Sequence, residues 1–398
     1  MTTDFAATRQ MFDLPEGVIY LDGNSLGPLP KGVAERVART VAGEWGQGLI
    51  RSWNDAGWMD LPRRVGDRIA RLIGAEPGSV VMGDTLSIKV YQALASALAM
   101  VPDRRVVLSD SGNFPSDLYV AEGLLRTLGP DYRLHVVAPE EVAGAIDESV
   151  AAVMLTETDY RTGRRHDMAG IARRTHDAGA LLVWDLAHSA GAFPLAVARD
   201  GADFAVGCTY KFLNGGPGAP AFIHVAPRHQ MRARPALAGW LGHAEPFAFE
   251  PAYRPAEGIE RMRVGTPPII QLAALDAALD LWEGVDMNDL RAASLALQDR
   301  FIAAVEAGCP GLALVTPREH ARRGSQVSFR HPQGYAIMRA LIAQGVIGDF
   351  RAPDILRFGI TPLYIGADDI DMAAAILTTI LREELWDSPE FHTRARVT

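Results

Sequence analysis

Residues 180–211 read ALLVWDLAHSAGAFPLAVARDGADFAVGCTYK and hold two short apolar runs, ALLVWD and ADFAVGC. Each run leads into polar side chains: Asp185 ends the first and His188 follows it, and Lys211 comes just after the second. Runs that are apolar on both faces are typical of parallel strands covered by helices on both sides. Asp185 and Lys211 lie about one strand–connection–strand unit apart, so we expect both side chains in one crevice at the carboxyl edge of a sheet.

The same pattern continues on both sides of this segment. Amphipathic helical patterns separate several further apolar runs, and strands that alternate with helices predict an α/β fold with a mainly parallel sheet. The further strand-like runs are 104–110, 132–138, 150–158 and 219–226, and the helical patterns are 87–100, 116–129 and 167–180.

The pattern changes near residue 268. Long helical stretches such as MNDLRAASLALQDRFIAAVEAG follow, separated by short strands, and the N-terminal helical pattern GVAERVARTVAGEW is expected to join them. We therefore expect a large α/β domain over 50–268 and a smaller α+β domain made of 1–49 plus 269–398. A helix that starts at 268 would bridge the two.

The amino-acid composition limits which binding partners and which cellular compartment this protein can have. The net charge of −9 over 398 residues argues against a nucleic-acid or anionic-membrane partner, because both attract basic surfaces. The sequence has no apolar run long enough to span a membrane, and its first residues do not look like a signal peptide. Its two cysteines, Cys208 and Cys309, give neither a disulfide framework nor a metal-binding spacing. We expect a cytoplasmic protein without a metal site.

Lysine is rare in this chain. Only Lys31, Lys89 and Lys211 occur among 39 basic residues, and the rest are arginine. A lysine amine can form an imine, whereas a guanidinium stays protonated and cannot. Lys211 stands between Tyr210 and a glycine-rich loop, which favours a nucleophilic amine; taken alone, the position is also compatible with an ordinary loop residue.

A second candidate feature is an anion site upstream. The run VVMGD is followed by Thr85, Leu86 and Ser87, which open a predicted helix. Free N–H groups at a helix N-terminus, with the Ser87 hydroxyl, suit a phosphate. The alternative is simple N-capping by Thr85 or Ser87.

After the strand at 104–110, Phe114 and Asp117 stand at the start of a helix. Each polar or aromatic position has an ordinary structural interpretation: a core ring, a helix cap or a buried histidine. Together an anion cup, an aromatic ring, a strand-end carboxylate and an amine match what pyridoxal 5′-phosphate requires. The lysine holds its aldehyde as an imine, and a carboxylate such as Asp185 keeps the ring nitrogen protonated.

A nicotinamide cofactor fits less well. No G-x-G-x-x-G follows an early strand, and the GGPG after Lys211 lacks the strand–helix context of that fingerprint. The P-loop pattern is absent from the sequence as well.

Seven motifs, spread in order over most of the chain, resemble the kynureninase family. These are enzymes of the pyridoxal-phosphate fold-type I group, within the superfamily similar to class V aminotransferases. The resemblance implies a large domain with a seven-stranded-type sheet, and hydrolytic cleavage of the β–γ carbon bond of L-kynurenine to anthranilate and L-alanine in tryptophan catabolism. The motifs are YLDGNSLGPLP (20–30), FPSD (114–117), WDLAHSAGA (184–192), YKFLNGGPG (210–218), GW (239–240), RVGTPPI (263–269) and ILRFGITPLY (355–364).

The resemblance implies roles for the residues that bind the cofactor. Lys211 matches the imine-forming lysine, and Tyr210 matches a tyrosine that reaches the phosphate and takes part in proton transfer. Leu86 and Ser87 match the phosphate-binding pair, where the family often has Thr at the second position.

Around the cofactor ring, Phe114 matches the stacked aromatic residue. Asp185 and Asp117 match carboxylates that lie toward the ring nitrogen. His188 matches a histidine that contacts the cofactor near its phenolic oxygen.

Two further positions imply a homodimer with active sites at its interface. Trp240 and Thr266 match residues that reach the cofactor phosphate of the neighbouring subunit. Gly265 and Thr266 replace the Ser-Asn of animal-type members, and this bacterial-type pattern favours L-kynurenine over its 3-hydroxylated form. Trp53 is expected to line the aryl pocket.

Arg357 matches the arginine that binds the substrate α-carboxylate. A planar guanidinium can hold a carboxylate through two hydrogen bonds, which supports this role independently. The alternative is an ordinary surface ion pair.

Three other functions are alternatives to kynurenine cleavage. A class V aminotransferase or β-lyase would share the fold and the cofactor. A cysteine desulfurase needs a cysteine on a mobile loop, whereas Cys208 lies at a strand end and Cys309 in a turn. A binding protein without catalysis would be expected to lose the lysine, the strand-end aspartate or the arginine, and all three are present.

Overall fold

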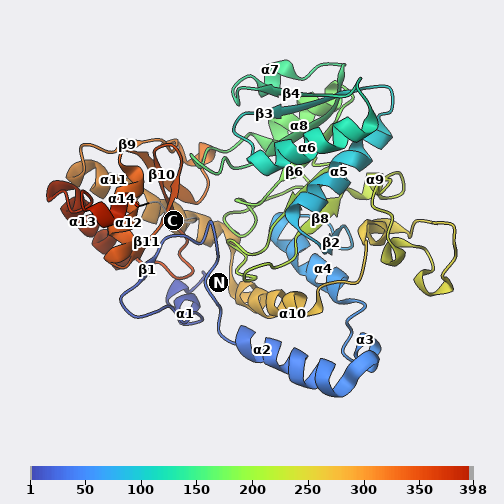
Figure 1. Ribbon diagram of the computed structural model, residues 1–398, viewed down its shortest axis with the longest axis horizontal. Coiled ribbons are helices and arrows are strands. Elements are labelled where there is room, and N and C mark those ends of the chain that lie inside the picture. The colour runs from blue at the N-terminus through green and yellow to red at the C-terminus, as the bar shows by residue number, and fades with distance from the viewer. Residues whose placement is uncertain (1, 394–398) are drawn as a thin grey trace.

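A computed structural model describes residues 2–393. Its largest sheet has seven strands in the order β2-β8-β7-β6-β5-β3-β4 (Figure 1). Strands β4, β3, β5, β6 and β7 are parallel, whereas β8 is antiparallel to both β7 and β2. The predicted mainly parallel α/β sheet is confirmed, with β8 as the one reversed strand. The strands are β2 (Val80–Met82), β3 (Val106–Asp110), β4 (Arg133–Val137), β5 (Val150–Thr156), β6 (Leu181–Asp185), β7 (Phe204–Gly207) and β8 (Phe222–Val225).

Apolar residues of the inner strands are buried on both faces of this sheet. Leu182 and Trp184 of β6 belong to the hydrophobic core on one face, and Leu181 and Val183 belong to the core on the other. Strand β4, at the edge, is the exception and is partly exposed. Helices α5 (Leu86–Met100) and α6 (Pro115–Leu128) pack on one face, and α4 (Leu61–Ile73) and α8 (Met168–Asp177) on the other.

The C-terminal part forms a separate antiparallel sheet of order β12-β13-β10-β9, seen in orange and red in Figure 1. Strand β1 (Ile19–Tyr20) pairs with β11 (Val346–Ile347), which ties the N-terminal segment to this part. The domain boundaries near residues 50 and 268 stay a prediction. The elements are β9 (Ala313–Leu314), β10 (Gln326–Arg330), β12 (Asp349–Arg351), β13 (Ile355–Gly359), α11 (Met287–Gly308), α12 (Gly334–Ala343), α13 (Ala367–Arg382) and α14 (Pro389–His392).

Two predicted helices change their winding. The helix expected from residue 268 is α10 (Ile269–Ala278), which packs on α2 and α4 and then tightens into a 3-10 segment, Leu279–Gly284. That segment buries Trp282 completely. Helix α2 (Val33–Arg39) widens into π-helical turns over Thr40–Gly48 before α3 (Ser52–Asp55).

The remaining elements are short. Among residues 2–393, no helix is long and apolar enough to cross a membrane. The short segments are α1 (Phe5–Arg9), α7 (Val142–Ala145), α9 (Pro227–Gln230), and the 3-10 turns Leu49–Arg51, Trp240–Gly242, Pro246–Ala248, Gly258–Met262 and His320–Arg322.

Candidate active site

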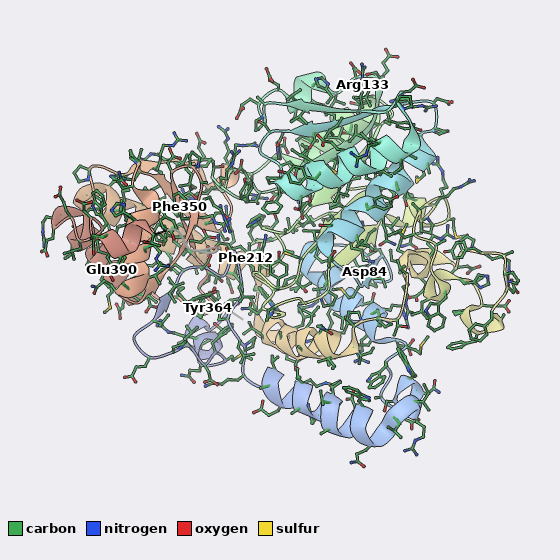
Figure 2. The ribbon with its side chains drawn as sticks, viewed as in Figure 1. Asp84, Arg133, Phe212, Phe350, Tyr364 and Glu390 are labelled. Carbon is green, nitrogen blue, oxygen red and sulfur yellow. The ribbon has the colours of Figure 1, made fainter. Side chains whose placement is uncertain are left out.

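The carboxyl ends of β6 and β7 bring three predicted residues together. Asp185 is the last residue of β6, and Lys211 follows β7 by a short turn. The Nε2 of His188 lies 2.9 Å from the Nζ of Lys211. Figure 2 places Phe212, the next residue along the chain, in the middle of the molecule between the large sheet and the C-terminal part. The strand ends therefore bring Asp185, His188 and Lys211 to one edge of the sheet.

The surroundings of Lys211 favour an uncharged amine. Burial lowers the pKa of Lys211, and burial, followed by the nearby charge of Lys211, lowers the pKa of His188 far below its usual range. The rings of Tyr210 and Phe114 lie 5.8 and 5.9 Å from the Lys211 nitrogen. A neutral amine next to a neutral imidazole can act as a nucleophile and as a base.

Two buried carboxylates face the same space with few partners. Asp185 accepts a hydrogen bond from the Ala187 N–H at 2.8 Å and a long one from the Thr156 hydroxyl at 3.3 Å. Neither carboxylate oxygen of Asp117 has a hydrogen-bond partner in the described part of the chain. Burial raises the pKa of Asp185 to about 6, and burial together with the charge of Asp185 raises that of Asp117 well above its usual value. Such a pair fits a ligand that brings a protonated ring nitrogen.

Thr156 is a contact that the sequence interpretation missed. It is the last residue of β5 and stands directly opposite Asp185 in the parallel pairing of β5 with β6. Its hydroxyl also contacts the Asn113 side-chain oxygen, so it links the strand-end carboxylate to the turn before Phe114. The sequence does contain a signal for this contact, because Thr156 is a polar residue near the end of the apolar run 150–158.

The turn between β2 and α5 is the place where the sequence predicts an anion cup. Asp84, labelled in Figure 2, has a left-handed backbone with φ of 56°, and Thr85 is the N-cap of α5 but makes no side-chain capping bond. The first N–H groups of α5, at Leu86 and Ser87, are therefore available to an anion. Thr85 occupies the N-cap position, but its hydroxyl does not cap the helix, so the predicted alternative of side-chain capping is wrong for this residue. With the unpaired carboxylates and the amine, this cup fits pyridoxal phosphate.

Comparisons with known proteins agree with this chemistry. Residues 290–377 match the family model described as the kynureninase C-terminal domain. Curated proteins named kynureninase, from Burkholderia pseudomallei strain 1106a and from Pseudomonas fluorescens, are each 52% identical over 99% of this chain and 96% of their own length. This chain belongs to the kynureninase family.

Solved structures with the same fold are more distant in sequence. An apo cysteine desulfurase from Thermococcus onnurineus NA1 superposes with a TM-score of 0.80 at 18% identity, covering 96% of this chain and 99% of that one. The desulfurase CsdA from Escherichia coli gives 0.79 at 18% identity over 96% and 100%. These likenesses establish the fold that the kynureninase family shares with other fold-type I enzymes, and no more.

Arg357, which the family resemblance places at the substrate carboxylate, is buried in β13 with only 1% of its surface exposed. Its guanidinium contacts Asp349, the Tyr160 carbonyl at 2.6 Å and the Ser25 hydroxyl at 2.8 Å. The alternative of a surface ion pair is therefore wrong. Ser25 lies in the motif YLDGNSLGPLP, so that motif has a contact with the arginine as well.

Three predicted kynureninase positions, Trp53, Trp240 and Thr266, are not among the residues that contact the Lys211 amine. Trp53 packs edge-on against Trp58 in the segment after α2. Trp240 packs edge-on against Phe247 and is partly exposed, and Thr266 is exposed. Within residues 2–393 none of the three makes a side-chain hydrogen bond. Their roles, Trp53 at the aryl pocket and Trp240 and Thr266 at the phosphate of the neighbouring subunit, stay predictions.

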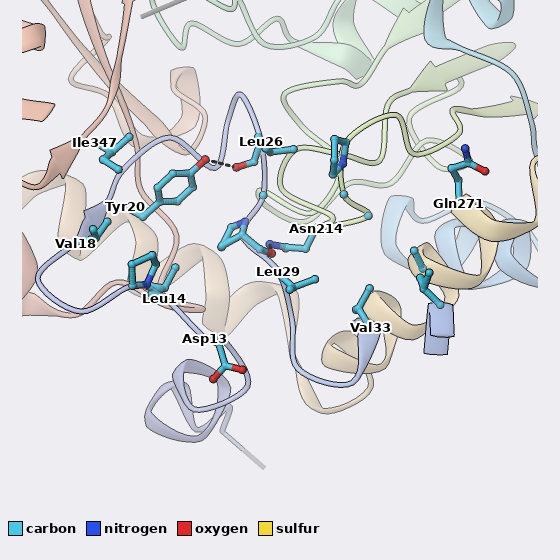
Figure 3. Close-up of a pocket in the computed structure, with 18 of the residues that line it drawn as sticks. Asp13, Leu14, Val18, Tyr20, Leu26, Leu29, Val33, Asn214, Gln271 and Ile347 are labelled. Atoms are coloured by element: carbon cyan, nitrogen blue, oxygen red, sulfur yellow. Dashed lines mark hydrogen bonds between the residues drawn. The ribbon is translucent and has the colours of Figure 1, made fainter. Parts of the chain in front are cut away.

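A pocket of about 570 Å³ lies behind the backbone of Lys211 (Figure 3). Tyr20, Asn214 and apolar residues from the N-terminal segment and α10 line it, and the Tyr20 hydroxyl donates to the Leu26 carbonyl at 2.8 Å. None of the predicted cofactor residues lines it. Gly27 separates it from the site, because its N–H donates to the Tyr210 carbonyl and a side chain there would collide with the Lys211 carbonyl.

Proposed function

We propose that this chain catalyses the kynureninase reaction: hydrolytic cleavage of the β–γ carbon bond of L-kynurenine to anthranilate and L-alanine, with pyridoxal 5′-phosphate as cofactor. The supporting observation is the convergence of Lys211, His188 and two underpaired carboxylates at the carboxyl edge of the sheet, in a chain of this family. A second substrate, 3-hydroxykynurenine, is proposed as a weaker one because Gly265 and Thr266 follow the bacterial-type pattern.

When bound, the cofactor supplies an aldehyde carbon for amines and a ring that accepts electron density from the bonds of the substrate α-carbon. Lys211 would hold the aldehyde, and its free amine would remove the proton from the substrate α-carbon. Its lowered pKa leaves part of the amine unprotonated for this step. Asp185, supported by Asp117, would accept a hydrogen bond from the ring nitrogen and keep it protonated.

Other residues hold the ends of the cofactor. The N–H groups of Leu86 and Ser87 bind the phosphate at the start of α5. Phe114 would cover the ring, and His188, which lies 2.9 Å from the Lys211 amine, would contact the ring oxygen. Together these residues would orient the cofactor relative to the substrate.

Tyr210 is the proposed acid for the last step. Burial raises the pKa of its hydroxyl above the usual value, so this group stays protonated at neutral pH. It can then give a proton to the β-carbon that leaves as alanine. Arg357 holds the α-carboxylate, and Trp53 lines the space for the aryl group. A water molecule is the second reactant, because the bond cleaved is hydrolysed at the γ-carbonyl.

We propose a homodimer in which Trp240 and Thr266 of one subunit complete the phosphate site of the other. The support is a set of exposed large apolar side chains in the described chain. Phe247 and Phe249 are 64% and 75% exposed in the loop that follows α9 (Figure 1), and Trp45, Leu49 and Ile50 are exposed near α3. Trp240, Phe247 and Phe249 also contact one another, and exposed apolar side chains that gather in this way mark an interface.

We also propose a cytoplasmic location and the two-domain division, 50–268 against 1–49 plus 269–398. Both cysteines are unpaired, which suits a reducing compartment. The separate sheets on either side of α10 support the division.

One incubation tests the proposed reaction. Purified holoenzyme with L-kynurenine should release anthranilate and L-alanine in equal amounts, followed by anthranilate fluorescence and amino-acid analysis. A keto acid in place of alanine would instead identify an aminotransferase. The desulfurase alternative has no support here, because Cys208 and Cys309 are both buried.

A further inference from the structure

Arg357 has few donors left for a substrate. A guanidinium carries five N–H groups. The Nε–H and one Nη2–H of Arg357 donate to the Asp349 carboxylate, the second Nη2–H to the Ser25 hydroxyl, and one Nη1–H to the Tyr160 carbonyl. A single Nη1–H remains. Arg357 therefore cannot hold a carboxylate through two hydrogen bonds unless one of these contacts is given up.

A second arginine stands next to it with donors to spare. Arg351 donates from Nη2 to Asp349 at 2.7 Å and to Ser25 at 3.1 Å. Its Nε is fully buried and has no partner in the described chain, and its Nη1 makes no hydrogen bond there. An unpaired buried donor on a cation is costly unless a ligand satisfies it.

The strand register directs both arginines to the same side. Asp349 stands opposite Arg357 across the β12–β13 pair, and Arg351 is two residues along β12 from Asp349. Residues two apart on a strand share a face, and so do direct cross-strand partners. The charge of Arg351 also lowers the pKa of His188 and Lys211, after the larger effect of burial, so it lies close to the reacting groups.

The charges of Arg351, Arg357, Asp349 and Asp22, here called the arginine cluster, can be balanced by one more anion. Burial alone would raise the pKa of Asp349, but Arg357 and Arg351 outweigh it and hold the pKa below its usual range, so this carboxylate is ionised. Asp22, also at the cluster, has its pKa raised to about 7 by burial and by Asp349. With Asp22 protonated, two arginines face one carboxylate, and a substrate carboxylate balances the remaining positive charge.

We propose that Arg351 is a second substrate-binding arginine, which shares the α-carboxylate with Arg357 next to the Ser25 hydroxyl that both guanidinium groups contact. This assignment rests on the proposed function only in taking an α-amino acid as the ligand. The carboxylate would receive the spare N–H of each guanidinium, and Ser25 would keep its contact with Asp349 at 2.5 Å.

The test measures binding of the proposed product, L-alanine, to holoenzyme by titration calorimetry, with alaninamide as the matched ligand that lacks the carboxylate. Arg351→Met should weaken L-alanine binding by about tenfold or more and leave alaninamide within about twofold, since a charge-assisted hydrogen bond is lost. Arg351→Lys, which keeps the charge, should fall between wild type and Arg351→Met. This variant also carries the test if the methionine variant does not fold.

The control variant is Arg330→Met, which removes an arginine paired with Asp354 at 3.1 Å on the same sheet. It should leave both ligands unchanged. Equal loss of L-alanine and alaninamide in Arg351→Met would overturn the proposal, because it would indicate a structural role, and so would unchanged L-alanine binding. Kynurenine turnover by wild type is scored separately. Loss of L-alanine affinity in a protein that fails to cleave kynurenine would keep Arg351 as a carboxylate ligand and reject the reaction.

Discussion

At the scale of single residues, Lys211 is the residue on which the proposed chemistry depends. Among residues 2–393 its amine has His188 as its one hydrogen-bond partner, and burial lowers its pKa. Lys211→Ala should therefore lose the visible absorbance of the bound cofactor imine and reduce turnover at least about a thousandfold. Absorbance spectroscopy of the purified variant with added cofactor checks this. A variant that kept the same absorbance band would show that another amine holds the cofactor.

Asp22 gives a prediction about pH. Its pKa is raised to about 7, so the group is neutral below that pH and negative above it. Because a negative Asp22 competes with the substrate carboxylate for the arginines, KM for L-kynurenine should rise severalfold from about pH 6 to about pH 8. Asp22→Asn should flatten this rise in steady-state kinetics. The charged and titratable groups around Asp22 are Tyr20, Asp349, Arg351, Arg357 and Tyr364.

If the rise in KM were the same in Asp22→Asn, one of those neighbours or the cofactor itself would be responsible. The variant Asp67→Asn is the matched control. Asp67 lies in α4, and its side chain accepts from the Gly78 N–H outside the cluster.

Much of the site follows from the sequence, because strand ends are readable. Asp185 and Lys211 stand at the ends of apolar runs, and parallel pairing brings such ends together. Arg351 and Asp349 were missed because their partnership depends on an antiparallel register between two short strands, which no local pattern encodes. Thr156 was missed although it ends an apolar strand in the same way as Asp185, with which it pairs in parallel.

At the scale of elements, Asp203 links β6, α8 and α9 through hydrogen bonds. It is buried beside β7 and accepts hydrogen bonds from the Leu182 N–H, His176, Arg228 and His229. Burial alone would raise its pKa, but the histidine hydrogen bonds outweigh this and lower it. Asp203→Asn should cost about 2–4 kcal/mol of unfolding free energy at neutral pH.

The pH dependence follows from the sign of that shift. A carboxyl group with a depressed pKa stabilises the fold above its unfolded-state pKa and loses this contribution as the pH falls. The gap between wild type and Asp203→Asn in urea unfolding should therefore shrink from pH 7 toward about pH 3. A gap that stays constant over this range would show that shape, and not charge, accounts for the loss.

Element boundaries were less predictable than element types. The runs at 180–185 and 202–208 are β6 and β7 nearly as expected, because their apolar residues must be buried on both faces. The reversed direction of β8 was not foreseen, since an apolar strand looks the same in either direction. The π-helical turns after α2 have no sequence signal that we recognise.

At the scale of the whole molecule, the proposed dimer predicts complementation. Lys211→Ala and a Trp240→Ala/Thr266→Ala double variant should each be inactive alone. Co-refolded in equal amounts, about half of the dimers are mixed, and each mixed dimer has one intact site, so about a quarter of wild-type activity should return. Light scattering should give twice the 43.0 kDa of one chain. Mixed dimers without recovered activity would place Trp240 and Thr266 outside the partner's site.

The reversed strand β8 also sets a length. It lies between β2 and β7 and is antiparallel to both, so β2 points the same way as β7 and its end emerges at the same edge. Neighbouring strands are about 4.8 Å apart, so the turn after β2 stands about 14 Å from the end of β6, three strand spacings away. The sheet thus fixes the distance between the anion cup and Asp185. A ligand without a phosphate group, such as pyridoxal, would be too short to contact both the anion cup and Asp185.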